Sequence, residues 1–273
     1  MEERLGVFYG VSVGPGDPEL LTMKACRVLK ACPVIAAPQS QSGEQLALSI
    51  AGQAVDLDGK TLISLPFTMS RNPEVLAAAW EKNADLVAAY LDRGADVAMV
   101  VLGDVSTYST YCYVMERLKQ RGYPTQMIPG VTSFAAIAAR LGESLVEGRE
   151  VLHVLPASHP DQLAGLDLPG TKILMKSGRE LPQVLAVLQE KGLLDRAQLV
   201  ANCGLPGELV CRDLRELDQP VGYYATIIVK ECGRRAPPRP IPAAAVQSQN
   251  SLSSAPFRPR HKKNTAYTPP SRR

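Results

Sequence analysis

The sequence has few of the side chains that metal centres, disulfide frameworks and nucleophilic triads require. Its 273 residues include six cysteines and three histidines. No cysteine belongs to a CxxC pair or has a histidine at zinc-ligand spacing, so we expect reduced cysteines that pack in the interior. His153 falls within a predicted strand, where a satisfied structural role is the simpler interpretation, while His159 and His261 lie in a loop and in the C-terminal tail. This inventory favours a chemistry that needs no strong protein base.

Long hydrophobic runs are also missing. No apolar stretch reaches the roughly 18 residues that a membrane-spanning helix needs, although 45% of the residues are apolar and can form a substantial core. The first four residues (MEER) pass at once into a strand pattern, which is not typical of a signal peptide. We therefore expect a cytoplasmic protein without membrane association. A chain of this length favours two domains.

Acidic residues are missing from the C-terminal end of the chain. Residues 234–273 contain nine Lys and Arg and no Asp or Glu, which leaves 21 basic against 27 acidic residues, a net charge of −6, in the rest. This tail has eight prolines and no periodic apolar residues, so we expect it to be disordered. A solvated extension is the simplest interpretation, although a basic tail could contact nucleic acid or anionic lipid. Because the body is acidic, we expect no nucleic-acid partner.

Apolar runs alternate with helical patterns along the body and predict an α/β fold. The predicted strands are 5–13, 34–37, 62–67, 96–102, 125–128, 150–155, 171–175, 198–201 and 223–229. Several of them lack polar alternation, as expected for strands that are covered on both faces.

The helical patterns between these strands have defined starts. Tyr108, Tyr111, Met115 and Leu118 fall at helical spacing and predict a core stripe on a helix over 108–121. Residues 17–19 (DPE) and 72–74 (NPE) each offer an N-cap followed by proline and an acid, which is a typical helix start.

We expect a two-domain fold in which each domain is a mostly parallel or mixed sheet flanked by helices. The predicted boundaries are 1–130 for an N-terminal α/β domain, 131–232 for a C-terminal α/β domain and 233–273 for the basic tail.

Three loops follow strands of the first domain, where ligands gather in open α/β sheets. Residues 10–18 (GVSVGPGDP) lack the third glycine of GxGxxG, and they also lack GK[ST], which excludes a P-loop. Residues 102–110 (LGDVSTYST) contain Gly103, which would let a ligand approach the backbone, but the polar residues there could equally cap a helix. In residues 128–134 (IPGVTSF), Thr132 or Ser133 could cap a helix or contact a cofactor.

In this order the segments resemble the tetrapyrrole methylase family, the two-domain methyltransferases of corrin and sirohaem synthesis. The resemblance covers about residues 5–230 and rests on 14–25 (GPGDPELLTMKA), 103–104 (GD), 129–134 (PGVTSF) and 203–208 (CGLPGE). It is greatest to the enzymes that methylate C-20 of precorrin-2 or cobalt-factor II, through 34–38 (VIAAP), 46–51 (LALSIA) and 65–70 (LPFTMS). One departure is Val105, which stands where many relatives have proline and for which we expect little consequence.

The resemblance implies S-adenosyl-L-methionine as the methyl donor, held between the domains, and the C-20 meso carbon of precorrin-2 or cobalt-factor II as the acceptor. It further implies a homodimer. The alternatives are another methylase of the same fold, acting on a different corrin carbon or on uroporphyrinogen III, and a non-catalytic module that binds the cofactor or a tetrapyrrole.

The resemblance also implies the residues of the site. Those expected at the cofactor are Gly103, Asp104, Val105, Ser106, Thr107, Tyr108, Thr132, Ser133, Met175, Cys203, Ala225 and Thr226. Pro15 and Gly16 are expected on the wall of the tetrapyrrole site. By their location near strand ends or loops, the candidate partners of the tetrapyrrole carboxylates are Arg71, Arg140, Lys176 and Arg179, since arginine is well suited to carboxylates. Solvation at the surface is the alternative for each of them. No base is identified for the meso proton, and Asp104 and Tyr108 are the candidates.

Overall fold

A computed structural model describes residues 4–39, 45–68, 70, 72–158, 160–178, 180–218 and 220–231, all within one compact unit. The predicted tail, His159, His261, Arg71 and Arg179 lie outside the described residues.

The first sheet is parallel throughout. It consists of β1 (Phe8–Ser12), β2 (Val34–Gln39), β3 (Thr61–Pro66), β4 (Val97–Val101) and β5 (Thr125–Ile128), in the order β3-β2-β4-β1-β5. Every residue of β4 is buried, which explains its uninterrupted run of apolar side chains.

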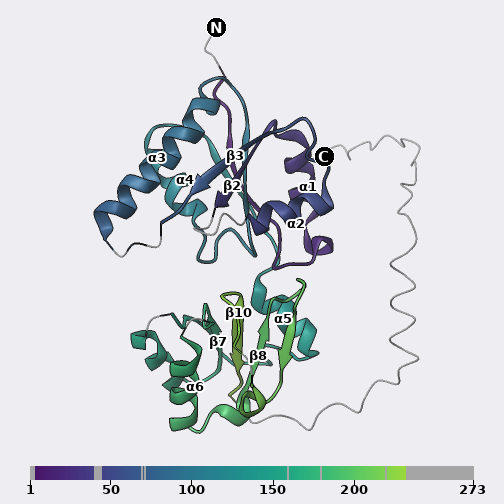
Figure 1. Cartoon of the computed structure of the whole chain (residues 1–273), viewed down its shortest axis with the longest axis vertical. Helices are drawn as coiled ribbons and strands as arrows, with labels where there is room; N and C mark the ends of the chain where they lie inside the picture. The colour runs from purple at the N-terminus through teal and green to yellow at the C-terminus, as the bar shows by residue number, and fades with distance from the viewer. Residues whose placement is uncertain are drawn as a thin grey trace, which may run out of the picture. The chain divides into compact units, whose positions relative to one another are not determined.

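Helices cover both faces of this sheet, as Figure 1 shows. They are the 3-10 turn η1 (Pro18–Leu20) and the helices α1 (Met23–Ala31), α2 (Leu46–Ala54), α3 (Pro73–Leu91) and α4 (Tyr111–Gln120). Side chains of α1 and α2 form one core with Val11, Ile35 and Val100, and those of α3 and α4 form the other with Phe8 and Met99.

The arrangement of these helices defines a switch in strand order. The helix after β1 covers one face of the sheet and the helix after β4 covers the other, while β1 and β4 are neighbours. Ligands of open α/β sheets bind outside the carboxyl ends of the strands at such a point. The loops that follow Ser12 and Val101 therefore mark the candidate site.

The second sheet is mixed. It consists of β6 (Leu152–Pro156), β7 (Thr171–Met175), β8 (Ala197–Ala201), β9 (Leu209–Cys211) and β10 (Ala225–Val229), in the order β6-β7-β10-β8-β9. Only β6 and β7 pair in parallel. Because Thr226 pairs with Met175 and Ala225 with Ala201, the carboxyl ends of β7 and β8 lie at one edge with the start of β10.

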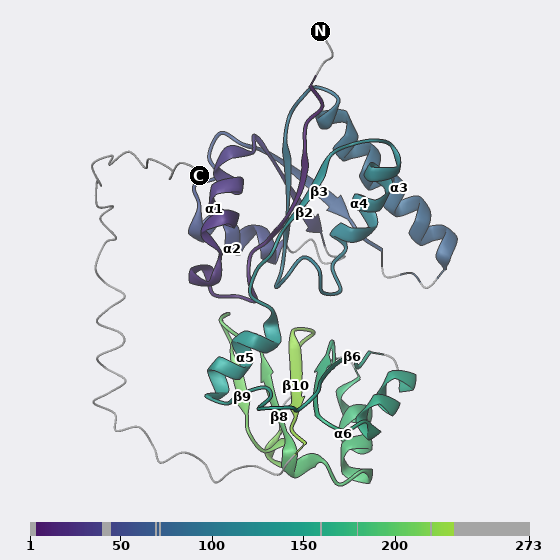
Figure 2. The same ribbon diagram turned by 180° about the vertical axis from the view of Figure 1, so that it is seen from behind.

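Helices cover this sheet on both faces too. The elements are α5 (Ser133–Leu141), η2 (Pro160–Asp167), α6 (Leu181–Glu190), η3 (Leu194–Arg196) and η4 (Leu214–Glu216). Although α5 follows β5 directly, it packs on the second sheet through Ile137, beside Ile173 and Ile228, as Figure 2 shows for the ribbon. The chain therefore passes from one sheet to the other between Ile128 and Ser133.

The α/β class and all nine predicted strands are confirmed, with bounds that differ by up to three residues. The prediction missed β9, whose three residues are too few to show a period. The helical assignment of Tyr108 was wrong, because this residue precedes α4 with φ +50° and is 44% exposed. Asn72 caps α3 as predicted, but Asp17 caps η1 instead of an α-helix, and Thr22 caps α1.

A buried serine joins the ends of three segments of the first sheet. Ser12 is fully buried, and its Oγ donates to the Ile128 carbonyl at 2.8 Å and accepts from the Val105 backbone N–H at 2.9 Å. Val105 thus supplies a backbone N–H that a proline at this position would lack.

Replacing this serine should destabilise the fold. Ser12→Ala leaves one buried N–H and one buried carbonyl without this partner, and we expect a loss of about 1–3 kcal/mol in the free energy of unfolding. The exposed Ser49→Ala is the control, with an expected change within about 0.5 kcal/mol. Urea denaturation measures both, and equal stability of the two variants would contradict a joining role for Ser12.

Candidate functional site

The first two candidate loops are bonded to each other through their backbones. The Gly103 N–H donates to the Gly14 carbonyl at 2.7 Å, and the Gly14 N–H donates to the Gly103 carbonyl at 3.2 Å. Both glycines have left-handed backbones, with φ +74° and +73°. A Cβ on Gly103 would meet nothing within 4 Å, so open space adjoins this backbone at the switch point.

Asp104 ties the second loop to the third. Its Oδ1 accepts from the Ser106 N–H at 2.9 Å and from the Ser106 hydroxyl, and its Oδ2 accepts from the Gly130 N–H at 2.8 Å. Gly130 must be glycine because a Cβ there would lie 2.4 Å from the Ser12 Cβ. Burial alone would raise the pKa of Asp104, but these hydrogen bonds outweigh it and lower the pKa. Both oxygens of this ionised carboxylate are thus engaged within the protein, which favours positioning over proton transfer.

The remainder of the second loop divides into a buried and an exposed part. Val105 is 1% exposed and Thr107 is half-buried, with its N–H donating to the Asp104 carbonyl. Ser106 and Tyr108 are exposed. Ser109 is buried, and its Oγ accepts from the Tyr111 N–H, so it orders the start of α4.

The third loop presents a hydroxyl without a partner. Thr132 occupies the N-cap position of α5, but its side chain makes no capping hydrogen bond. The Ser133 Oγ is buried and has no hydrogen-bond partner among the described residues. An unpaired buried hydroxyl costs free energy, which singles out this position among the loop residues.

The edge of the second sheet meets the opening loop in direct contact. A Cβ on Gly16 would lie 2.3 Å from the Cys203 carbonyl oxygen, and one on Gly204 would lie 2.6 Å from the Asp17 nitrogen. Leu205 packs against the core formed by α1 and α2. Glycine is therefore required on both sides of this contact, which brings the segments GPGDP and CGLPG together.

This contact changes the expected position of Pro15 and Gly16. Both residues are buried, and Gly16 packs on the backbone of Cys203. A role on the tetrapyrrole wall stays a prediction, and the close approach of the two loops already accounts for the glycine.

The residues predicted on the second sheet gather at the same edge. Met175 ends β7, with Ala225 and Thr226 at the buried start of β10, and Thr226 pairs with Met175. Lys176 follows Met175 with φ +59°, and its Nζ lies 5.2 Å from the centre of the Tyr108 ring. The second candidate loop therefore also faces this sheet.

Arg140 is engaged by the protein itself. It forms an ion pair with Glu208, whose other carboxylate oxygen accepts from the Gly204 N–H at 2.8 Å. Sequence reasoning missed this role of Glu208, together with Ser12 and Gly130. A hydroxyl inside the apolar run of β1 was the available signal for Ser12.

Cys32 and His153 take structural roles. The five described cysteines form no disulfide, and no group of His, Cys, Asp and Glu among the described residues could hold a metal ion. Burial, followed by the charge of Asp96, raises the pKa of Cys32 to about 12, which makes it an unreactive packing thiol. The His153 Nε2 lies 2.9 Å from the Pro169 carbonyl, as expected for a satisfied histidine.

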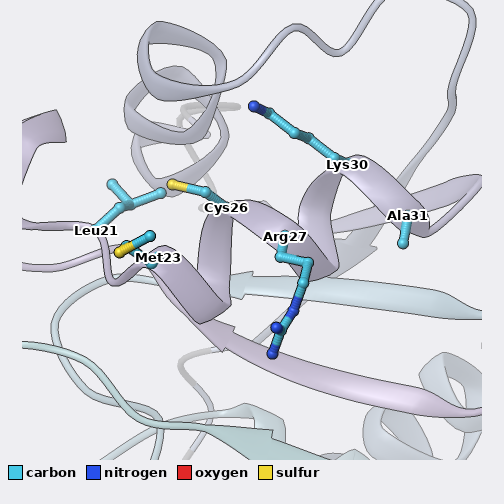
Figure 3. A pocket seen from close by; sticks show the side chains of 6 residues that line it. All are labelled: Leu21, Met23, Cys26, Arg27, Lys30 and Ala31. Atoms are coloured by element: carbon cyan, nitrogen blue, oxygen red, sulfur yellow. The ribbon is translucent and has the colours of Figure 1, made fainter. Parts of the chain in front are cut away.

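A shallow concavity lies on α1 and shares no residue with this site. It has a volume of about 520 Å³, and Figure 3 shows Leu21, Met23 and Cys26 near the start of the helix, with Arg27 and Lys30 pointing apart.

None of the helices in the described part of the chain is long and apolar enough to span a membrane.

The fold and the joined loops at the switch point define an α/β protein with a parallel and a mixed sheet and a candidate ligand site at the joined loops. The model of the tetrapyrrole (corrin/porphyrin) methylases matches residues 7–218, and the chain belongs to this family.

Curated relatives align along most of the chain. The cobalt-precorrin-2 C(20)-methyltransferase of Salmonella typhimurium is 34% identical over 83% of this chain and 97% of its own length. A probable cobalt-precorrin-2 C(20)-methyltransferase of Methanocaldococcus jannaschii is 35% identical over 83% and 96%. The precorrin-2 C(20)-methyltransferase of a Sinorhizobium species is 31% identical over 82% and 95%.

Solved structures share the fold. A cobalt precorrin-4 methyltransferase superposes with a TM-score of 0.66 at 20% identity, over 82% of this chain and 94% of that one. A uroporphyrin-III C-methyltransferase of Thermus thermophilus, solved with S-adenosylhomocysteine, superposes with a TM-score of 0.59 at 21% identity, over 83% and 98%.

The role of Asp104 can be tested through the pH dependence of stability. Asn at this position offers a single acceptor oxygen, so Asp104→Asn should lose about 1–3 kcal/mol at pH 7. The lowered pKa of Asp104 means that its contribution is complete above the ordinary value of 3.8 and disappears as the pH falls through the lower folded value.

The difference between wild type and Asp104→Asn should therefore shrink below pH 3.8. Urea denaturation across this range measures it, with the exposed Asp161→Asn as the control. A difference that grows toward acid would contradict the engaged carboxylate.

Proposed function

We propose that this chain transfers the methyl group of S-adenosyl-L-methionine to the C-20 meso carbon of precorrin-2 or cobalt-factor II in cobalamin biosynthesis. The observation that supports it most directly is the agreement of three C(20)-methyltransferases, 31–35% identical, along 82–83% of the chain. The joined glycine loops at the switch point supply a site of the required kind.

The features of the site fit such a methyl donor. Gly103 leaves open space beside its backbone, the Ser133 hydroxyl lacks a partner, and the edge of the second sheet presents Met175, Ala225 and Thr226. Gly103–Tyr108 and Thr132–Ser133 would hold the methionine part of the cofactor, and the second-sheet residues with Cys203 would line the adenosine. The cofactor supplies an activated methyl group on a positively charged sulfur.

The chain's own residues have mainly to align the reacting atoms. Ser12 and Asp104 hold the three loops of the first sheet in one arrangement, and the contact of Gly16 with Cys203 holds these loops against the second sheet. Alignment of this kind can lower a barrier by about 7–11 kcal/mol. Since both oxygens of Asp104 are engaged, we propose that it positions the loops and leaves the meso proton to solvent or to the substrate.

The substrate carries several carboxylates, and the candidate partners differ in availability. Arg140 is paired with Glu208, whereas Lys176 has no ion pair or hydrogen bond with any described residue. We propose Lys176 as the main carboxylate partner, with Pro15 and Gly16 on the wall beneath the macrocycle and Arg71 as a further partner.

The main alternative is methylation at another position of a tetrapyrrole. A precorrin-4 C(11)-methyltransferase and a uroporphyrinogen III methyltransferase match at 35% and 33% identity, but over only 49% and 50% of this chain. The C(20) relatives match over 82–83% of the chain, which supports methylation at C-20. A non-catalytic binding module is the second alternative.

The domain division, the assembly and the location complete the proposal. We place the N-terminal domain at 1–130 and the C-terminal domain at 131–232, since α5 packs on the second sheet. From the family resemblance we propose a homodimer, and from the features of the sequence we propose a location in the cytoplasm.

Gly103 provides a matched test of the cofactor site. Gly103→Ala places a Cβ in open space at φ +73°, and Gly192→Ala does the same at φ +63° on a turn after α6. Both should lose about 1–2 kcal/mol of stability. Only Gly103→Ala should weaken binding of S-adenosylhomocysteine, by about tenfold or more, in calorimetry. Equal affinities of the two variants would show that the cofactor lies elsewhere.

The activity itself is tested with radiolabelled S-adenosyl-L-methionine under anoxic conditions. We expect methyl transfer to precorrin-2 or its cobalt form and none to uroporphyrinogen III. Transfer to uroporphyrinogen III alone would support the first alternative. Cofactor binding without transfer to any tetrapyrrole would support a binding module.

A further inference from the structure

Three residues other than glycine in the described part of the chain have a left-handed backbone conformation. They are Tyr108, Lys176 and Asn202, with φ between +50° and +59°. All three follow strands at the candidate site, in the loop after β4 and at the ends of β7 and β8. Strained conformations of this kind persist where a fixed direction of the side chain is needed.

Two of these residues face each other from the two sheets. The Lys176 Nζ lies 5.2 Å from the centre of the Tyr108 ring, within the range of a cation–π contact. The Tyr108 hydroxyl lies 3.4 Å from the carbonyl of Val154 on β6, the strand next to β7. The ring is thus placed beside the second sheet, under the ammonium group.

Lys176 differs in its surroundings from Lys60, Lys191 and Lys230, each of which has a polar partner. Lys191 pairs with Asp167, and Lys60 and Lys230 donate to backbone carbonyls. Lys176 is half-buried and has only the ring face as a partner among the described residues. Burial lowers the pKa of its ammonium group, and no carboxylate counters this effect.

A partly desolvated cation on an aromatic face keeps hydrogen-bond donors free for an anion. The ring attracts the positive charge but accepts no conventional hydrogen bond. The three N–H donors of the ammonium group therefore remain available. The contact also fixes a side chain that otherwise has many rotamers, which reduces the entropy lost when an anion binds.

We propose that Lys176, held in place by the Tyr108 ring, binds one peripheral carboxylate of the tetrapyrrole and thereby sets the orientation of the macrocycle toward the methyl donor. Tyr108 is a positioning residue in this account, acting through its ring and not through its hydroxyl. The inference rests on the proposed function. Lys176 and Tyr108 would together determine which edge of the polycarboxylate substrate enters the site.

The experiment uses the full chain and compares four variants with wild type under anoxic conditions. Lys176→Met removes the charge at similar length, Tyr108→Leu removes the ring, and Tyr108→Phe removes only the hydroxyl. Lys191→Met, which breaks an ion pair outside the site, is the control. For wild type and each variant, kcat and KM for precorrin-2 are measured. The Kd of S-adenosylhomocysteine is measured as well, and it reports whether the fold and the cofactor site are intact.

Lys176→Met should raise the KM for precorrin-2 by about 10- to 100-fold, the loss of one hydrogen bond to a charged group. The kcat should change far less than KM, and the Kd of S-adenosylhomocysteine should stay near wild type. Tyr108→Leu should raise KM in the same direction, and Tyr108→Phe should raise it clearly less. Lys191→Met should behave as wild type.

A wild-type KM in Lys176→Met with normal cofactor affinity would overturn the inference. So would a fall in kcat alone, which would indicate a role in the chemical step, or equal effects of Phe and Leu at position 108. Failure of the proposed function appears differently, as wild-type protein that does not methylate precorrin-2 or its cobalt form.

Discussion

The site depends on the pair of backbone hydrogen bonds between Gly14 and Gly103. These bonds join the loops after β1 and β4 at the point where the strand order reverses. Ser12 and Asp104 then connect the same loops to the segment after β5. Three loops that are far apart in the sequence thus become one rigid wall, whose backbone borders open space at Gly103. A site that catalyses by alignment requires this rigidity more than it requires reactive side chains.

The second sheet completes the site through an equally close contact. Gly16 lies against the Cys203 carbonyl and Gly204 against Asp17, so neither position has room for a side chain. Leu205 extends the contact into the core beneath α1 and α2. The opening loop therefore serves both sheets, which explains why its two glycines and its neighbour segment CGLPG occur together.

The fold was largely predictable because buried strands and capped helices have short-range signatures, and the run of β4 and the cap at Asn72 are examples. The loops of the site were located by the same means. The partners within the site were not predictable, because Ser12 reaches Ile128 and Asp104 reaches Gly130 only through the sheet order, over sequence separations of 116 and 26 residues. Tyr108 was assigned to a helix because apolar spacing does not reveal a left-handed backbone. Arg140 appeared available because its partner Glu208 lies 68 residues away.

The position of the transferred methyl group tests the account most directly. Wild-type protein is incubated with S-adenosyl-L-methionine labelled with carbon-13 in the methyl group and with precorrin-2 or its cobalt form, and the product is studied by NMR. We expect a single labelled methyl group on the C-20 meso carbon, together with loss of the proton from that carbon. A labelled methyl group on any other carbon, with C-20 still protonated, would contradict it.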